Sequence, residues 1–115
     1  MSHPAHNAGI VAPREFAPVF AALGDATRLS LVARLAVDDH RSISQLTEGT
    51  QLTRQAVTKH LRVLEQAGIV RCVRAGRESL FALDPGPIQA MRDYLNMVSL
   101  HWDEALGRLR EFVEK

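Results

Sequence analysis

The chain has 115 residues, of which 46% are hydrophobic, and this composition suits one globular domain rather than a disordered chain. Its single cysteine, Cys72, excludes an intramolecular disulfide, and no apolar run reaches the ~18 residues of a transmembrane helix. We therefore expect a soluble protein of the reducing cytoplasm with no membrane partner. Residues 1–13 lack the pattern of a signal peptide and predict a disordered tail, followed by a single domain at 14–115.

The formal net charge is only +1, but the charges are distributed unevenly. Residues 41–77 hold seven basic and two acidic side chains, whereas 1–40 hold three and four, and 78–115 hold four and seven. The middle third therefore offers a local footprint for a polyanion. On charge alone, a solvated basic face without a partner is an equal alternative.

Helical spacing of apolar residues predicts four helices, at about 14–23, 26–37, 44–48 and 54–67. Asp25 and Thr53 are good N-caps for the second and fourth helices, and either Ser42 or Ser44 can cap the third. Gly68 closes the fourth helix. The pattern thus predicts two helices, a short helix, a turn and a further helix.

After Gly68 the pattern becomes strand-like at 69–74 and 79–83, and Gly76 between them suits a tight hairpin. Residues 84–87 form a break, and Pro87 suits the first position of a last helix that runs to about residue 114.

Apolar residues on this last helix alternate three and four apart over nearly four heptads. Such a seam needs a partner surface, which could be the first helix, a second copy of the chain, or both; packing on its own core alone is the alternative. Tyr94, Met97, Leu106 and Val113 widen the apolar surface beyond one seam, which favours a dimer. The predicted dimer residues on the first and last helices are Phe16, Val19, Phe20, Ile88, Met91, Leu95, Val98, Trp102, Leu106 and Leu109.

A helix–turn–helix followed by a β-hairpin is a winged helix, so the predicted fold is mainly α with a small β-hairpin wing, in the order α-α-α-α-β-β-α. Leu46, Val57, Leu61 and Leu64 can lock the short third helix against the fourth. The other face of the fourth helix and the wing carry side chains suited to bases and phosphates. The predicted DNA-binding residues are Ser44, Gln45, Thr53, Arg54, Gln55, Thr58, Lys59, His60, Arg62, Arg74 and Arg77.

Within this set we expect Arg54, Gln55 and Thr58 nearest to bases, because recognition helices usually probe the major groove with their N-terminal half. Lys59 and Arg62 of the fourth helix, and Ser44 and Gln45 of the third, are expected at phosphates. The wing arginines would reach the adjacent minor groove or backbone, with a charged turn that keeps the edge soluble as the alternative. His60 could equally contact a phosphate or brace the helix.

Two stretches resemble the ArsR/SmtB family of bacterial repressors: residues 22–29 (ALGDATRL), similar to the family's opening signature, and 55–70 (QAVTKHLRVLEQAGIV), similar to its recognition helix and wing entry. Residues 102–106 (WDEAL) resemble a non-metal branch of that family. The resemblance implies a homodimer, joined by the first and last helices, that binds an imperfect inverted repeat and usually acts as a repressor. An unidentified small-molecule effector stays open.

The family's metal motifs are missing. The third helix, 44–48 (SQLTE), has no cysteine, and the last helix has only His101, with Glu104 three residues away, which is short of four zinc ligands. We therefore predict no metal and no cofactor, with a metal-responsive repressor of non-standard site as an alternative. Cys72 is expected to be a small buried apolar residue, although neighbouring arginines could make it reactive.

Rival classes have weaker support. The sequence has no phosphate-binding loop and no nucleophile with a base at a telling spacing, so we predict that it is not an enzyme. The basic segment holds no aromatic residue for base stacking, which disfavours RNA. A winged helix used only for protein contacts is the remaining alternative, and the basic middle segment disfavours it.

Overall fold

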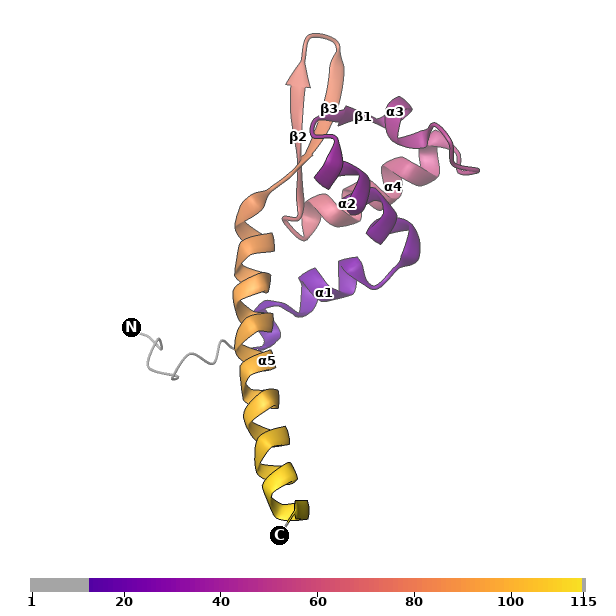
Figure 1. The fold of residues 1–115 in the computed structure, drawn as a ribbon. Helices are drawn as coiled ribbons and strands as arrows, with labels where there is room; N and C mark the ends of the chain where they lie inside the picture. The colour runs from indigo at the N-terminus through magenta and orange to yellow at the C-terminus, as the bar shows by residue number, and fades with distance from the viewer. Residues whose placement is uncertain (1–12, 115) are drawn as a thin grey trace, which may run out of the picture.

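The structure, a computed structural model, describes residues 13–114 (Figure 1). A 3-10 turn at Pro13–Glu15 precedes the helices and strands. The helices are α1 (Ala17–Leu23), α2 (Ala26–Val37), α3 (Ile43–Thr47), α4 (Arg54–Gln66) and α5 (Pro85–Glu114), and the strands are β1 (Arg41–Ser42), β2 (Val70–Ala75) and β3 (Glu78–Leu83). The predicted mainly helical fold with a hairpin wing is confirmed, with one additional short strand. The predicted tail at 1–13 lies outside the described residues except for its last position.

The first helix begins three residues later than the expected Arg14. Pro18 has no backbone N–H and its ring would clash with the carbonyl four residues before it, so it is tolerated only in the first turn of a helix. The helix therefore starts at Ala17, and the residues before it form the 3-10 turn.

The last helix begins at Pro85, not at the expected Pro87. The side chain of Asp84 accepts a hydrogen bond from the backbone N–H of Gly86 at 3.0 Å, which satisfies one of the free amides of the first turn. Pro85 then occupies the first helical position, where its missing N–H costs nothing.

Strand β1 was not predicted, because two residues are too short to show an alternating pattern. It pairs antiparallel with β3, Arg41 opposite Phe81 and Ser42 opposite Leu80, and gives a sheet of order β1-β3-β2. β2 and β3 form the predicted hairpin, in which Ala75 lies opposite Glu78 and Gly76 takes a φ of 64° in the turn. Gly76 thereby supplies the left-handed conformation that other residues rarely adopt.

The core lies where α2, α3, α4 and the base of the sheet meet. Leu46 of α3 and Val57, Leu61 and Leu64 of α4 have no exposed surface, as the sequence predicted. Leu35 of α2 and Phe81 of β3 complete this buried cluster. The short third helix and the fourth helix are therefore held together by one apolar core.

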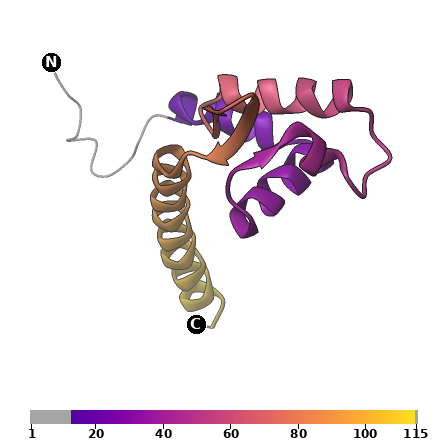
Figure 2. The same ribbon diagram turned by 90° about the horizontal axis from the view of Figure 1, so that it is seen from above.

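The long helix α5 extends well beyond the rest of the domain (Figures 1 and 2). Its 30 residues span about 45 Å, and the molecule measures 64 × 39 × 20 Å. Tyr94 stacks on Phe16, just before α1, at 4.9 Å between ring centroids, so the N-terminal end of α1 packs against α5 partway along its length (Figure 1). No helix in the described part of the chain has the length and apolar character needed to cross a membrane.

Replacing a fully buried residue of α4 is expected to be costly. Leu61→Ala removes apolar contacts and leaves a cavity, so it should lower the free energy of unfolding by about 2–5 kcal/mol in urea titrations. Val37→Ala, at a position that is 82% exposed near the end of α2, is the matched control and should change it little. A small effect at Leu61 would mean that α4 is not anchored in this core.

Candidate nucleic-acid interface

Helix α4 has one apolar face in the core and one polar face in solvent. Arg54, Gln55, Lys59 and Arg62 are all exposed, whereas the residues between them on the inner face are buried. The 3.6-residue period of the helix separates the two sets. Four of the predicted base and phosphate contacts on this helix therefore lie together on its outer face.

The start of α4 is fixed by a side-chain cap. The hydroxyl oxygen of Thr53 accepts a hydrogen bond from the backbone N–H of Ala56 at 3.0 Å, which confirms the predicted cap. Thr58, which was expected near bases, is half-buried, and its hydroxyl donates to the carbonyl of Arg54 at 2.7 Å. Its hydroxyl hydrogen is thus used within the helix, and only the oxygen remains as an acceptor.

Helix α3 is capped by Ser42, which settles the choice between the two serines. The Ser42 hydroxyl accepts from the backbone N–H of Gln45 at 3.1 Å, and the Gln45 side chain accepts from the backbone N–H of Ser42 at 2.9 Å. This reciprocal capping box uses the Gln45 side-chain oxygen and leaves its amide NH₂ as a donor. Ser44 and Gln45 are both exposed in the first turn of α3.

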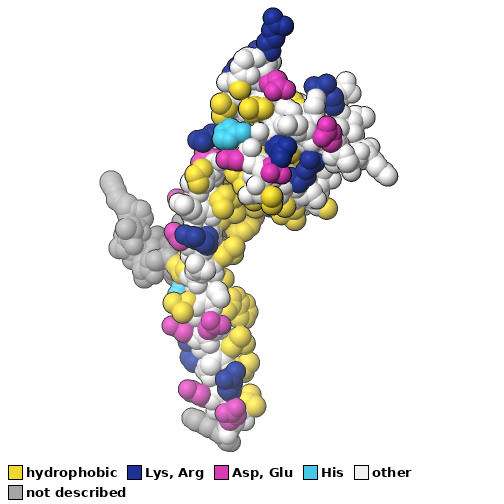
Figure 3. Space-filling view, turned by 45° about the horizontal axis from the view of Figure 1, so that its top comes forward, with side chains coloured by type: hydrophobic (Ala, Val, Ile, Leu, Met, Phe, Trp, Pro, Cys, Tyr) yellow, Lys and Arg dark blue, Asp and Glu magenta, His cyan; other side chains and the backbone are white. Residues whose placement is uncertain are grey.

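The wing carries its basic residues at the far end of the hairpin. Arg74 lies on β2 opposite Ser79, Arg77 lies in the turn, and both are exposed. Figure 3 shows a basic side chain at the extreme tip. Among the described residues no carboxylate lies within 4 Å of Arg54, Lys59, Arg74 or Arg77, whereas Arg62 pairs with Glu65 at 2.8 Å. These four cations are therefore available to bind phosphates.

His60 belongs to a polar cluster that joins α4 to the start of α2. Its Nδ1 lies 3.2 Å from the Arg28 guanidinium and 3.8 Å from the Asp25 carboxylate, and its side chain is only 26% exposed. Arg28 also donates from Nε to the carbonyl of Ala22. These contacts favour the bracing role for His60 over a phosphate contact, since the cluster connects α4 to the α1–α2 corner.

Asp25 caps α2 as predicted, with its carboxylate accepting from the backbone N–H of Arg28 at 3.0 Å. This hydrogen bond is the largest cause that lowers the pKa of the Asp25 carboxyl, although desolvation opposes it. The positive charge of Arg28 and the interaction with His60 lower the pKa further. The ionised carboxylate is therefore the form that the folded state prefers.

Sequence reasoning missed two arginines that position the helix–turn–helix. One is Arg28, and the other is Arg34 of α2, whose guanidinium donates to the carbonyls of Leu46 at 2.6 Å and Gln45 at 2.8 Å. A cation at the C-terminal end of a helix satisfies carbonyls that have no partner within the helix. A basic residue on the inner side of an amphipathic helix was the only signal, and it does not identify such distant partners.

The residues of the predicted dimer surface differ in how far the single chain already buries them. Val19 and Met91 are only 9% and 8% exposed and belong to the core of the single chain. Phe16, Ile88 and Val98 are half-buried. The other five members are exposed, and they are Phe20, Leu95, Trp102, Leu106 and Leu109. Figure 3 shows hydrophobic side chains along one side of the projecting helix.

Cys72 is exposed, so the expectation of a buried apolar residue was wrong. It lies on β2, which is an edge strand of the sheet, and only Val70 at the start of that strand is buried. Within the described residues no group of three or more His, Cys, Asp or Glu side chains is placed to hold a metal ion.

The helix–turn–helix of α3 and α4, followed by the β2–β3 wing, defines a winged helix–turn–helix domain. A family model described as a helix–turn–helix domain matches residues 23–73. The HTH-type transcriptional regulator Rv2034 of Mycobacterium tuberculosis is 32% identical over 93 residues, which is 81% of this chain and 83% of that protein. An ArsR-like transcriptional regulator from Rhodococcus sp. RHA1 is 31% identical, covers 86% of this chain and 92% of its own, and superposes with a TM-score of 0.73.

The chain therefore belongs to the ArsR family of winged helix–turn–helix transcriptional regulators, as the sequence resemblance predicted. The same fold occurs in Mb0332 from Mycobacterium bovis, whose solution structure is described as a homodimeric winged helix–turn–helix DNA-binding domain. That protein is 21% identical, with a TM-score of 0.62 over 88% of this chain and 90% of its own.

The capping carboxylate generates a pH prediction. Asparagine can also cap a helix, so Asp25→Asn removes the charge and keeps the cap. Because folding lowers the pKa of Asp25, its stabilising effect is present above the unfolded pKa of about 3.9 and is lost as the pH falls through the folded value. Wild type should be the more stable at pH 7 in urea titrations, and the gap should close toward pH 3; a gap of constant size would contradict the assignment.

Proposed function

We propose that the chain regulates transcription as a homodimer that binds a specific duplex DNA site, an imperfect inverted repeat, and that it acts as a repressor. The observation that carries this proposal is the outer face of α4, where Arg54, Gln55 and Lys59 are exposed and no carboxylate of residues 13–114 pairs with either cation. Membership of the ArsR family supports DNA binding, and repression is that family's usual mode of action.

The dimensions of α4 suit a major groove. The helix has 13 residues, about 20 Å in length, and its N-terminal half carries the side chains that can read base edges. Arg54 can donate two hydrogen bonds to a guanine, and Gln55 can pair with an adenine. Lys59, Ser44 and the amide of Gln45 would then hold phosphates on either side. Arg74 and Arg77 would reach the neighbouring minor groove or backbone from the wing.

Dimerisation through α1 and α5 is supported by the surface that the single chain leaves uncovered. On α5, Trp102 is 63% exposed, Leu109 is 56% exposed and Phe112 is 77% exposed. Apolar residues in a row over several turns gain free energy when a second copy covers them. Two-fold symmetry would present two copies of α4 to two half-sites, and the homodimeric description of Mb0332 is consistent with this arrangement.

The direct test is fluorescence anisotropy of the full chain on the duplex upstream of its own gene and on a shuffled duplex of equal composition, over a salt series. We expect tight binding to the native duplex alone, with a steep fall in affinity as salt rises. Equal binding to both duplexes would move the search to other promoters, because the native site would not be this one. Absence of binding to either at low salt would favour a protein-contact module.

Two substitutions on α4 should separate base reading from phosphate contact. Arg54→Ala should relax sequence preference at a cost of about 1–3 kcal/mol on the specific site. Lys59→Gln should weaken binding to all sequences and reduce the salt slope by about one. Arg92→Gln, an exposed arginine on α5, is the control and should bind as wild type does. If Arg54→Ala keeps wild-type discrimination, the base-reading role is wrong.

The exposed apolar row on α5 predicts a substitution that should disrupt the dimer. Trp102→Glu places a charge in the apolar row, and it should convert the dimer to a monomer at micromolar concentration in analytical ultracentrifugation. The control is Val37→Glu, since Val37 is also exposed but lies on α2, which is far from the projecting distal half of α5 that carries Trp102 (Figure 1). A Trp102→Glu protein that remains dimeric would show that the copies associate elsewhere.

A further inference from the structure

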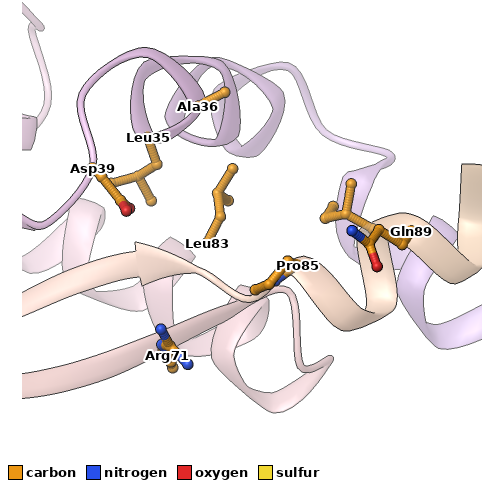
Figure 4. A pocket seen from close by; sticks show the side chains of 8 residues that line it. Leu35, Ala36, Asp39, Arg71, Leu83, Pro85 and Gln89 are labelled. Atoms are coloured by element: carbon orange, nitrogen blue, oxygen red, sulfur yellow. The ribbon is translucent and has the colours of Figure 1, made fainter.

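A cavity of about 460 Å³ lies where the end of α2, the base of the wing and the first turn of α5 meet (Figure 4). We call it the α2–α5 cavity. Its volume lies within the range of natural small-molecule sites. The residues around it are Leu35, Ala36, Asp39, Arg71, Leu83, Pro85, Ile88 and Gln89.

The floor of the α2–α5 cavity is apolar. Leu35 comes from α2, Leu83 from the end of β3 and Ile88 from α5, so three separate elements contribute. In Figure 4 the side chain of Leu83 points toward α2, where Leu35 and Ala36 lie. These side chains would cover a hydrocarbon body, and the burial of its surface would be the main source of affinity.

The rim carries one cation without a partner. Arg71 is exposed, and no carboxylate of the described residues lies within 4 Å of it. Its opposite residue on β3 is Ala82, which has no charge to offer. Asp39 stands across the cavity on the α2 side, where it is 3.5 Å from His40. A guanidinium at the rim of an apolar cavity is suited to bind a carboxylate through two parallel hydrogen bonds.

The α2–α5 cavity also joins the two parts of the molecule that the proposed function uses. Arg71 is three residues before Arg74 on the same strand, and Ile88 is one turn before the buried Met91 on α5. A ligand that contacts both elements fixes the angle between the wing and the long helix. In a dimer that angle sets the spacing of the two recognition helices.

We propose that the α2–α5 cavity binds a small organic acid with an apolar body, with the carboxylate on Arg71, and that the bound acid lowers the affinity for DNA. The second half of this inference rests on the proposed function. A ligand in the cavity stabilises the arrangement of α2, wing and α5 described here. By linkage it lowers the affinity for DNA if the DNA complex requires a different arrangement of these elements.

Calorimetric titration of the full chain without DNA tests the binding half. The probes are 3-phenylpropionate, octanoate and 2-naphthoate, each compared with the alcohol of the same carbon skeleton. We expect at least one acid to bind, and its alcohol to bind about tenfold more weakly. No binding of any acid up to about 10 mM, a concentration at which even weak specific sites fill, would overturn the inference, as would equal binding of acid and alcohol.

Variants then locate the site. Arg71→Gln should weaken the acid about tenfold, and Ala36→Trp should abolish binding because the indole fills the cavity from an exposed helix position. Arg92→Gln is the control and should bind as wild type does, and thermal unfolding checks that all three fold. Wild-type affinity in both Arg71→Gln and Ala36→Trp would place the acid elsewhere and contradict the assignment.

Anisotropy on the specific duplex, with and without the acid that binds, tests the regulatory half. A lower DNA affinity in wild type but not in Ala36→Trp supports it. Unchanged or raised DNA affinity overturns the regulation while leaving the proposed function intact. If the chain binds no DNA at all, the proposed function fails, and the calorimetry still decides whether the acid site exists.

Discussion

The burial of one face of α4 is the constraint on which the rest of the molecule depends. Val57, Leu61 and Leu64 are anchored against Leu46 and the base of the sheet without exposed surface. Because an α-helix turns by a fixed angle per residue, this anchoring also decides which side chains face outward. The polar outer face of α4 is therefore a consequence of core packing.

Polar contacts between the helices add to the positioning that the apolar core provides. The Asp25–Arg28–His60 cluster ties α4 to the α1–α2 corner, and Arg34 ties the end of α3 to α2. Arg28 connects the N-terminal end of α2 to α4, and Arg34 connects its C-terminal end to α3. Helix α2 therefore positions both helices of the helix–turn–helix. Helix α5 plays a different part, since its distal half projects away from the other described elements (Figures 1 and 2). The exposed apolar row on this distal half is available to a second copy of the chain.

Local chemistry made much of this predictable. Asp25 and Thr53 are caps whose side chains accept hydrogen bonds from residues three positions further on, and Gly76 supplies the positive φ of its turn. Each of these features depends only on residues that are neighbours in the sequence. The apolar period of α4 likewise predicted both the buried residues and the polar face opposite them. The ArsR signatures agreed with this local reading, and the comparisons confirmed the family.

The features that the sequence did not predict correctly depend on partners distant in sequence, or on two neighbouring residues that both suit the same role. β1 exists only because β3 is beside it, and the arginines of α2 gain their roles from carbonyls and a histidine more than ten residues away. Pro85 and Pro87 both suit a helix start, and the hydrogen bond from Gly86 to Asp84 decides between them. Cys72 was expected inside because cysteine often is, yet an edge strand of the wing has little to bury it against.

The most direct test of the central claim is to follow backbone amide resonances of the full chain by NMR while its specific duplex is added. If the outer face of α4 reads DNA, the largest shifts should fall on residues 53–62 and on the wing tip at 74–77, with little change in the core strand β3. Shifts confined to α5 or to α2, with α4 unchanged, would contradict the account, because they would place the nucleic acid on another surface of the molecule.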